Sequence, residues 1–196
     1  HGPGVAVLIE PGDGAWWVAV AADDRVGLLG LVAGVLAVNR LAVRSARTET
    51  LGARAVTVWS VQPEFGEPPS PALLREDMRQ AFAGGLDIES KLKARAKAYR
   101  RVNTIAPPAA QFKVVPDASD RATVVEVRAH DAPGLLHTIA KAISSVGFSI
   151  EAAQVATLGS DVVDVFYLSS DGDRLDAAQA ASVRSVVLDA LATSDG

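Results

Sequence analysis

A six-position signature, Asp-x-x-Gly-Leu-Leu, occurs twice in this chain of 196 residues, at positions 24–29 and 131–136. Subtracting 24 from 131 gives an offset of 107, and the same offset aligns Thr-Leu-Gly at 50–52 with Thr-Leu-Gly at 157–159. Matched alanines and valines mean little in a sequence so rich in both, but two ordered motifs at one offset are specific. The chain is therefore predicted to hold two tandem copies of one domain.

Composition excludes several classes of protein. Hydrophobic residues make up 49% of the chain, which is enough to bury two small cores. With a formal net charge of -4, the chain lacks the positive electrostatic potential that nucleic-acid binding requires. No apolar run approaches the roughly 20 residues that span a bilayer, so we expect a soluble, cytoplasmic protein with no membrane contact. The absence of cysteine excludes disulfides and thiolate chemistry, and the start at His1 rather than Met predicts a fragment of a longer chain.

The hydrophobic pattern predicts the element order β-α-β-β-α in each copy. Alternating apolar residues indicate strands, helical spacing indicates helices, and Gly52 and Gly159 indicate tight turns. The first copy has its elements expected at 16–21, 27–38, 41–50, 53–61 and 71–83, and the second at 123–129, 134–146, 148–157, 160–168 and 175–192. Asp24 and Asp131 are expected to cap the first helix of their copy. The order predicts an α+β, ferredoxin-like fold that lacks its last strand, with an antiparallel sheet and helices on one face.

The missing fourth strand of each sheet has two candidate sources. The runs 5–10 and 112–117 are both β-like and are themselves 107 positions apart. Each sheet is completed either by the strand that precedes its own copy, or in the first domain by residues 112–115 returning to it. The sequence leaves both arrangements open.

The segment between the copies predicts a basic, amphipathic helix at 87–102. Its apolar side carries Ile88, Leu92, Ala96 and Tyr99, whereas lysines and arginines occupy the rest. One interpretation is a linker helix that packs its apolar side on a domain; the other is a docking element for an acidic partner. We expect a first domain at 1–84, a linker at 85–111 and a second domain at 112–196.

The repeated signature has a structural and a functional interpretation. In the structural one, the aspartate caps the helix, the glycine allows a sharp turn, and the leucines anchor the helix on the sheet. In the functional one, the helix start presents unpaired N–H groups and a partial positive charge that suit a small carboxylate. An aspartate beside it can hold an ammonium group. Together these groups would bind both ends of an amino acid.

The order strand, Asp-x-x-Gly-Leu-Leu helix, strand, Thr-x-Gly, strand resembles the ACT domain, a small regulatory module with a ferredoxin-like fold. The likeness is most specific at 123–136, 152–159 and 163–167. The chain is similar to the C-terminal ACT pair of bifunctional uridylyltransferase/uridylyl-removing enzymes. This resemblance implies glutamine as an allosteric ligand, upstream catalytic domains of the same chain as partners, and the PII protein as a partner of the full-length enzyme. It also leaves room for a homodimer.

The resemblance implies ligand contacts from both signatures. The expected ligand-binding residues are Asp24, Arg25, Val26, Gly27, Leu28, Asp131, Ala132, Pro133, Gly134 and Leu135. The family pattern is Asp-Arg-Pro-Gly-Leu-Leu, so Val26 replaces its proline in the first copy and Ala132 its arginine in the second. These departures imply unequal binding by the two sites.

No set of residues predicts catalysis or a metal site, and we expect a non-catalytic regulatory fragment without a cofactor. His130 and His137 lack the further ligands that zinc requires, and His137 is expected at the surface or between domains. Asp161 and Asp164 lie three positions apart in a strand and should face opposite sides, with Asp164 exposed or at an interface. The three tryptophans are expected to pack the sheet or a domain interface: Trp16, Trp17 and Trp59. The alternative function is a protein-interaction or dimerisation module with no small ligand.

Overall fold

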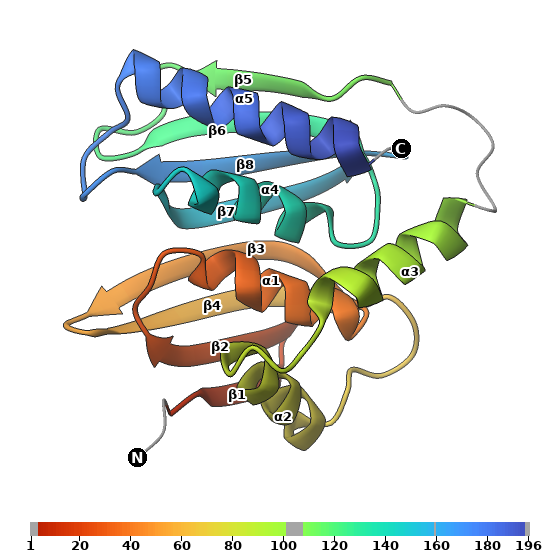
Figure 1. Ribbon diagram of the computed structural model, residues 1–196. Helices are drawn as coiled ribbons and strands as arrows, with labels where there is room; N and C mark the ends of the chain where they lie inside the picture. Colours follow the sequence, from red (N-terminus) through yellow and green to blue (C-terminus); the bar gives the residue numbers. More distant parts are fainter. Residues whose placement is uncertain (1–3, 101–107, 159, 195–196) are drawn as a thin grey trace.

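The computed structural model describes residues 4–100, 108–158 and 160–194, and it places two copies of one α/β unit side by side (Figure 1). The first copy consists of β1 (Ala6–Pro11), β2 (Trp16–Asp23), α1 (Leu28–Val38), β3 (Leu41–Leu51), β4 (Arg54–Pro63) and α2 (Pro71–Phe82). Helix α3 (Ile88–Arg100) leads to the second copy. That copy consists of β5 (Gln111–Val115), β6 (Thr123–His130), α4 (Leu135–Ser145), β7 (Ser149–Leu158), β8 (Asp161–Ser169) and α5 (Ala177–Ser194). The tandem α+β prediction is confirmed, while Gly159 and the expected end of the linker helix at 101–102 lie outside the described residues.

In the described part of the chain, all the strands belong to one antiparallel sheet of eight strands, in the order β1-β2-β4-β3-β7-β8-β6-β5. Strand β1 pairs with β2, and β5 pairs with β6. Each copy thus takes its fourth strand from the segment that precedes it. The other arrangement, in which residues 112–115 return to the first copy, is wrong.

The two copies join through their third strands. Strand β3 pairs with β7, and Ala46 lies opposite Ala153, its own equivalent at the 107-residue offset. The neighbouring pairs place Ser45 opposite Gln154 and Arg47 opposite Ala152. Because equivalent residues face each other, a pseudo-twofold axis passes between the two strands. Among the residues that the structure describes, three residue pairs make this junction, and they join two small sheets into one.

The helices cover one face of the sheet, and α1 and α4 lie next to each other over the junction (Figure 1). Glycines in α1 permit this approach: a Cβ on Gly30 would lie 3.3 Å from the backbone nitrogen of Lys141. A Cβ on Gly34 would lie 2.7 Å from Nδ1 of His137 and 2.8 Å from Cγ2 of Ile88. The two copies therefore touch in both layers of the fold. No helix in the described ranges has the length and hydrophobicity needed to cross a bilayer.

The core lies between the sheet and the helices and repeats at the same offset. Val18, Val20 and Trp59 are fully buried in the first copy. Their counterparts Val125, Val127 and Phe166 are buried in the second. Because successive side chains of a strand point to opposite faces, these side chains all point toward the helices, as expected for a sheet that is covered on one face. Trp17 has the opposite parity to Val18, and it keeps 48% of its surface exposed on the uncovered face.

Substitution of Gly34 tests the packing between the copies. The Cβ of Gly34→Ala would press on His137, whose ring cannot retreat freely because it is hydrogen-bonded to the carbonyl of Gly30. Such overpacking costs about 1–3 kcal/mol. We expect a lower midpoint of thermal unfolding, despite the better helix propensity of alanine. Gly85→Ala is the control, because a Cβ there meets only the carbonyl of Gln80 at 3.6 Å. An unchanged or raised midpoint for Gly34→Ala would contradict the tight contact.

Candidate functional site

The two signatures form the connections from β2 to α1 and from β6 to α4. Helix α1 begins after Gly27, whose φ is 86°, and α4 begins after Gly134, whose φ is 83°. Neither helix has a side-chain cap, so the prediction that Asp24 and Asp131 are N-caps is wrong. A glycine in the left-handed region occupies the cap position instead, because a side chain would be strained there. The aspartates remain at the strand ends.

A backbone hydrogen bond from its own N–H group holds each aspartate at the end of its strand. The N–H of Asp24 donates to the carbonyl of Ala53 at 3.0 Å, and the N–H of Asp131 donates to that of Ser160 at 2.9 Å. The Asp24 carboxylate accepts one hydrogen bond, from the hydroxyl of Thr50 at 3.2 Å. Most of its acceptor capacity therefore stays available to a ligand.

Each helix start also leaves N–H groups unused. In the first copy Leu28 donates to Arg25 at 3.2 Å and Leu31 donates to Gly27 at 2.9 Å. Within the described residues, the N–H groups of Leu29 and Gly30 between them have no backbone acceptor. The second copy repeats the pattern around Leu136. Unpaired N–H groups at a helix N-terminus favour an anionic group such as a carboxylate.

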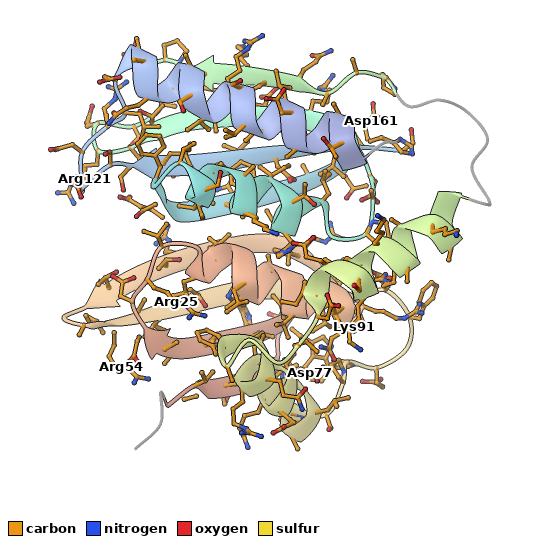
Figure 2. All side chains as sticks on the ribbon, in the orientation of Figure 1. Arg25, Arg54, Asp77, Lys91, Arg121 and Asp161 are labelled. Atoms are coloured by element: carbon orange, nitrogen blue, oxygen red, sulfur yellow. The ribbon has the colours of Figure 1, made fainter. Side chains whose placement is uncertain are left out.

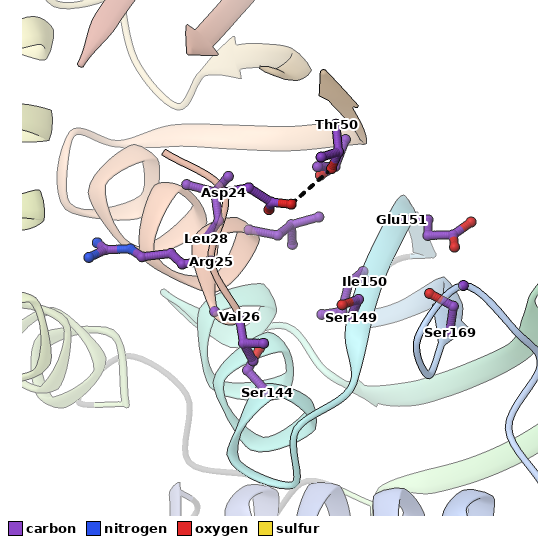
Figure 3. A pocket seen from close by; sticks show the side chains of 14 residues that line it. Asp24, Arg25, Val26, Leu28, Thr50, Ser144, Ser149, Ile150, Glu151 and Ser169 are labelled. Carbon is purple, nitrogen blue, oxygen red and sulfur yellow. Dashed lines mark hydrogen bonds between the residues drawn. The ribbon is translucent and has the colours of Figure 1, made fainter. Parts of the chain in front are cut away.

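The first pocket is a cavity of about 240 Å³ at the boundary between the copies (Figure 3). All five predicted residues of the first signature line it, and so do Thr48 and Thr50 of β3. The opposite wall comes from the second copy and contributes Ser144, Ser149 and Glu151. Arg25 extends away from this wall in Figure 3, and its guanidinium lies 4.7 Å from the ring centre of Phe82. The pocket is rich in hydroxyl groups.

The second pocket is its pseudo-symmetric counterpart, with a volume of about 490 Å³. It is lined by the five predicted residues of the second signature together with Val155, Thr157 and Asp164. The first copy supplies the opposite wall with Ala37, Arg40, Ala42, Val43, Glu64 and Phe65, and α3 adds Arg95 and Ala98. Thr157 takes the place of Thr50 at the offset. The structure thus gathers the ten predicted residues into two pockets, and their role in ligand binding stays a prediction.

Helix α3 ties both copies together beside the second pocket. His137 is buried between them: Nδ1 lies 2.7 Å from the carbonyl oxygen of Gly30, and Nε2 lies 3.2 Å from Oε1 of Glu89. Lys141 also donates to Glu89, and this bond holds the pKa of Glu89 below its usual value. Of the two expected places for His137, the interdomain one is observed.

The linker interpretation of α3 fits its packing. Ile88 and Leu92 are each 6% exposed and belong to the core, while Arg95 binds the carboxylate of Glu64 at 2.6 Å. Lys91, near the start of α3 in Figure 2, is exposed, and so is Lys93. Ile88 and Leu92 on the apolar side therefore pack and the lysines face solvent, while the side chain of Tyr99 lies outside the described residues.

Asp164 is the feature that the sequence interpretation missed. It is 1% exposed, and neither carboxylate oxygen has a hydrogen-bond partner within the described residues. Burial, and secondarily the charge of Asp131, raises the pKa of Asp164 to about 7. Of the two expected places for Asp164, the exposed one is wrong, because its side chain shares the inward parity of Val162 and Phe166; the side chain lines the pocket between the two copies instead. That shared parity was a readable signal.

Asp131 stands in a similar environment beside Asp164. Burial raises the pKa of the Asp131 carboxyl, the charge of His130 opposes the rise, and the charge of Glu64 adds to it. The second pocket therefore has two carboxyl groups whose pKa values burial raises, and that of Asp164 lies at about 7. In the described part of the chain, no group of three or more His, Asp or Glu side chains could hold a metal ion.

The buried carboxyl of Asp164 predicts a pH-dependent stability. The folded pKa lies above the unfolded value of 3.8, so the wild-type protein loses stability as pH rises from about 4 to about 7. Asp164→Asn abolishes this loss. Between about pH 5 and pH 7.5 the stability of the variant should rise relative to wild type by about 2–3 kcal/mol, from two pKa units. Urea unfolding at both pH values measures it, with Asp161→Asn, on the uncovered side of β8, as control. A difference that does not change with pH would show that Asp164 titrates normally.

Comparisons with known proteins agree with this architecture. The ACT domain family matches residues 123–184. The chain is 40% identical over 157 residues to the bifunctional uridylyltransferase/uridylyl-removing enzyme of Streptomyces coelicolor, covering 76% of this chain and 19% of that protein. The enzymes of that name from Gluconobacter oxydans and Mycobacterium tuberculosis are 37% identical over 167 residues and 36% identical over 179 residues. These matches cover 81% and 83% of this chain, and 17% and 22% of the relatives.

The chain thus spans about a fifth of the length of these curated relatives. A double-ringed trimeric microcompartment shell protein of known structure matches with a TM-score of 0.31 and 12% identity, over 93% of this chain and 85% of that one. That likeness is too weak to carry an argument. The family match shows that residues 123–184 belong to the ACT domain family, the duplicated fold gives the first copy the same architecture, and the chain as a whole is similar to the matching part of the bifunctional uridylyltransferase/uridylyl-removing enzymes.

Proposed function

We propose that this chain senses an amino acid, glutamine, and thereby regulates the uridylyltransferase and uridylyl-removing activities of catalytic domains elsewhere in a longer chain. Those activities would act on the PII protein. The observation that carries the proposal is the pair of pockets at the copy boundary. Each combines an aspartate with a helix N-terminus whose N–H groups are unpaired, and these two elements suit the ammonium and carboxylate groups of one amino acid.

Hydroxyl groups in the first pocket favour a ligand with an amide side chain. Thr48, Thr50, Ser144 and Ser149 all line this pocket. Each hydroxyl can both donate and accept a hydrogen bond, and a carboxamide offers both functions in return. The ammonium group would bind Asp24, and the carboxylate would approach the N–H of Leu29. The small cavity and its polar wall fit glutamine better than a large apolar amino acid.

The same architecture provides a route for regulation. Because each pocket has one wall from each copy, a ligand contacts both copies and favours the arrangement that fits it best. A ligand shifts a conformational equilibrium only by its differential affinity for the two states. Helix α3 contacts both copies beside the second pocket, so it would respond to any change in their arrangement. We place the bond-making chemistry in the parts of the relatives that this chain does not cover.

Calorimetric titration with L-glutamine tests the proposal. Asp24→Ala and Asp131→Ala should each weaken binding at one pocket by about 10- to 100-fold, because each removes a charge-assisted hydrogen bond. Asp23→Ala is the control: Asp23 precedes Asp24, is exposed, and pairs with Arg54 at 3.4 Å outside both pockets. Folded wild-type protein that gives only the heat of dilution would refute glutamine binding.

A second candidate, a protein-interaction module, is favoured by the uncovered face of the sheet. Leu8, Trp17 and Val58 on this face are 54%, 48% and 41% exposed. Both Leu8 and Val58 pair with Ala19, so they lie in one row across the strands. Light scattering at increasing concentration tests this candidate. Association that is abolished by Val58→Lys, in a protein inert to glutamine, would support it, whereas a monomer at all concentrations would exclude self-association.

A further inference from the structure

We propose that Asp131 and Asp164 together form a two-carboxylate seat for a primary ammonium group, so that the second pocket selects an amine-bearing ligand by a mechanism that the first pocket lacks. The inference rests on the proposed function, because it assumes that this pocket receives an amino acid. It adds a residue outside the signature and a basis for different behaviour of the two pockets. We call this pair the acidic seat.

The first argument is the unsatisfied carboxyl group of Asp164. Its two oxygens are buried without hydrogen-bond partners in the described residues, and its side chain lines the second pocket. Burying a carboxyl group without a partner costs several kcal/mol unless the group stays protonated or meets a donor. The second pocket, which Asp164 lines, is where a hydrogen-bond donor can reach this carboxyl group.

The protein's own cations are engaged elsewhere. Arg95 binds Glu64 and the carbonyl of Ala37, and His137 lies between Gly30 and Glu89. The guanidinium of Arg40 lies 6.0 Å from the ring centre of Phe65. These three are the basic side chains among the described residues that line the pocket. His130 does not line the pocket: its Nδ1 is buried 3.9 Å from Asp161, and its charge acts on Asp131 but is not among the causes that shift the pKa of Asp164. A donor for Asp164 therefore comes from a ligand.

An ammonium group fits this seat better than a metal ion. Calcium takes 6–8 oxygen ligands, whereas the seat offers two carboxylates and no third acidic or histidine ligand in the described residues. A primary ammonium has three donors and one positive charge. It can satisfy both carboxylates and offset the repulsion between them. The acidic seat thus recognises the ammonium group of a ligand rather than the ligand's side chain.

The first pocket has no equivalent of this seat. At the 107-residue offset, Thr57 occupies the position of Asp164, and it is also fully buried. Its hydroxyl accepts a hydrogen bond from Nε1 of Trp59 at 2.8 Å and lies 3.4 Å from the carbonyl oxygen of Val20. Thr57 does not line the first pocket. The carboxylates that line the first pocket are those of Asp24, which is exposed, and of Glu151 on the far wall.

Proton linkage follows from the position of Asp164. Its raised pKa means that the carboxyl is mostly protonated below neutral pH, and an ammonium ion needs it ionised. Binding at the second pocket should therefore release a proton and strengthen as pH rises. A folded pKa of about 7 predicts a gain of roughly 5- to 10-fold between about pH 6 and pH 7.5.

The test observes Asp164 directly in the full 196-residue chain. The protein is labelled with ¹³C at its aspartate carboxyl carbons and titrated with three probes: L-glutamine, its des-amino analogue glutaramate, and methylammonium. We expect glutamine and methylammonium to move the Asp164 signal and to lower its pKa, and glutaramate to leave both unchanged. In parallel calorimetry, Asp164→Asn should weaken glutamine binding at the second pocket at least about tenfold and abolish its pH dependence. Asp161→Asn, which removes a charge from the same strand outside the pocket, should do neither.

Each outcome decides between the two proposals. Glutamine binding that ignores both Asp164→Asn and pH would overturn the acidic seat and leave glutamine sensing intact. An Asp164 signal that responds to methylammonium in a protein inert to glutamine would keep the seat and reject the ligand. If neither amine moves the Asp164 signal, the seat is wrong. Binding of glutaramate as tightly as glutamine at the second pocket would also overturn it.

Discussion

The pairing of β3 with β7 is the contact on which the rest of the structure depends. Three residue pairs, centred on Ala46 and Ala153, join the two halves into one sheet. That register places α1 against α4, and the contact is close because Gly30 and Gly34 have no side chains. Both pockets open along this line, so neither would exist in an isolated copy. Loss of the junction would expose the apolar faces of α1 and α4 and remove the far wall of each pocket.

The offset of 107 predicted much of this architecture, because matched motifs imply matched strands and helices. It did not predict how the copies associate, since pairing within a chain and pairing between chains leave the same sequence pattern. The sequence therefore could not predict which residues form the far walls of the pockets, such as Ser149 in one and Arg40 in the other. The cap assignment failed for a local reason: both aspartate and glycine are compatible with a helix start, and the backbone selected the glycine.

The expected exposure of Asp164 was wrong for a different reason. Period-2 alternation places Asp161 and Asp164 on opposite faces of the strand, but it does not say which face is outward, and carboxylates in general favour the exposed one. Its neighbours Val162 and Phe166 and its counterpart Thr57 all face inward. Where a polar residue shares the parity of an apolar run, the run gives the stronger indication of direction. Such conflicts between local preference and pattern are where functional residues are to be expected.

Helix α3 makes the two halves chemically different although their backbones correspond. Leu92 packs against Gly134, where a Cβ would lie 2.6 Å from Cδ1 of Leu92, whereas a Cβ on Gly27 would meet only Ser144, at 3.8 Å. Helix α3 thus supplies part of the lining of the second pocket, whereas residues of the two copies line the first. Arg25 contacts Phe82 of α2 instead.

Covalent fusion of the halves has an evolutionary consequence. In a symmetric dimer of identical chains, any substitution at one pocket also appears at the other. A substitution that improves one pocket but harms the other therefore cannot be confined to the first. Here Thr57 and Asp164 occupy equivalent positions but are encoded separately, so each could mutate alone. A fused pair can therefore specialise, with one half tuned for affinity and the other for a condition of the cell, without losing the common scaffold.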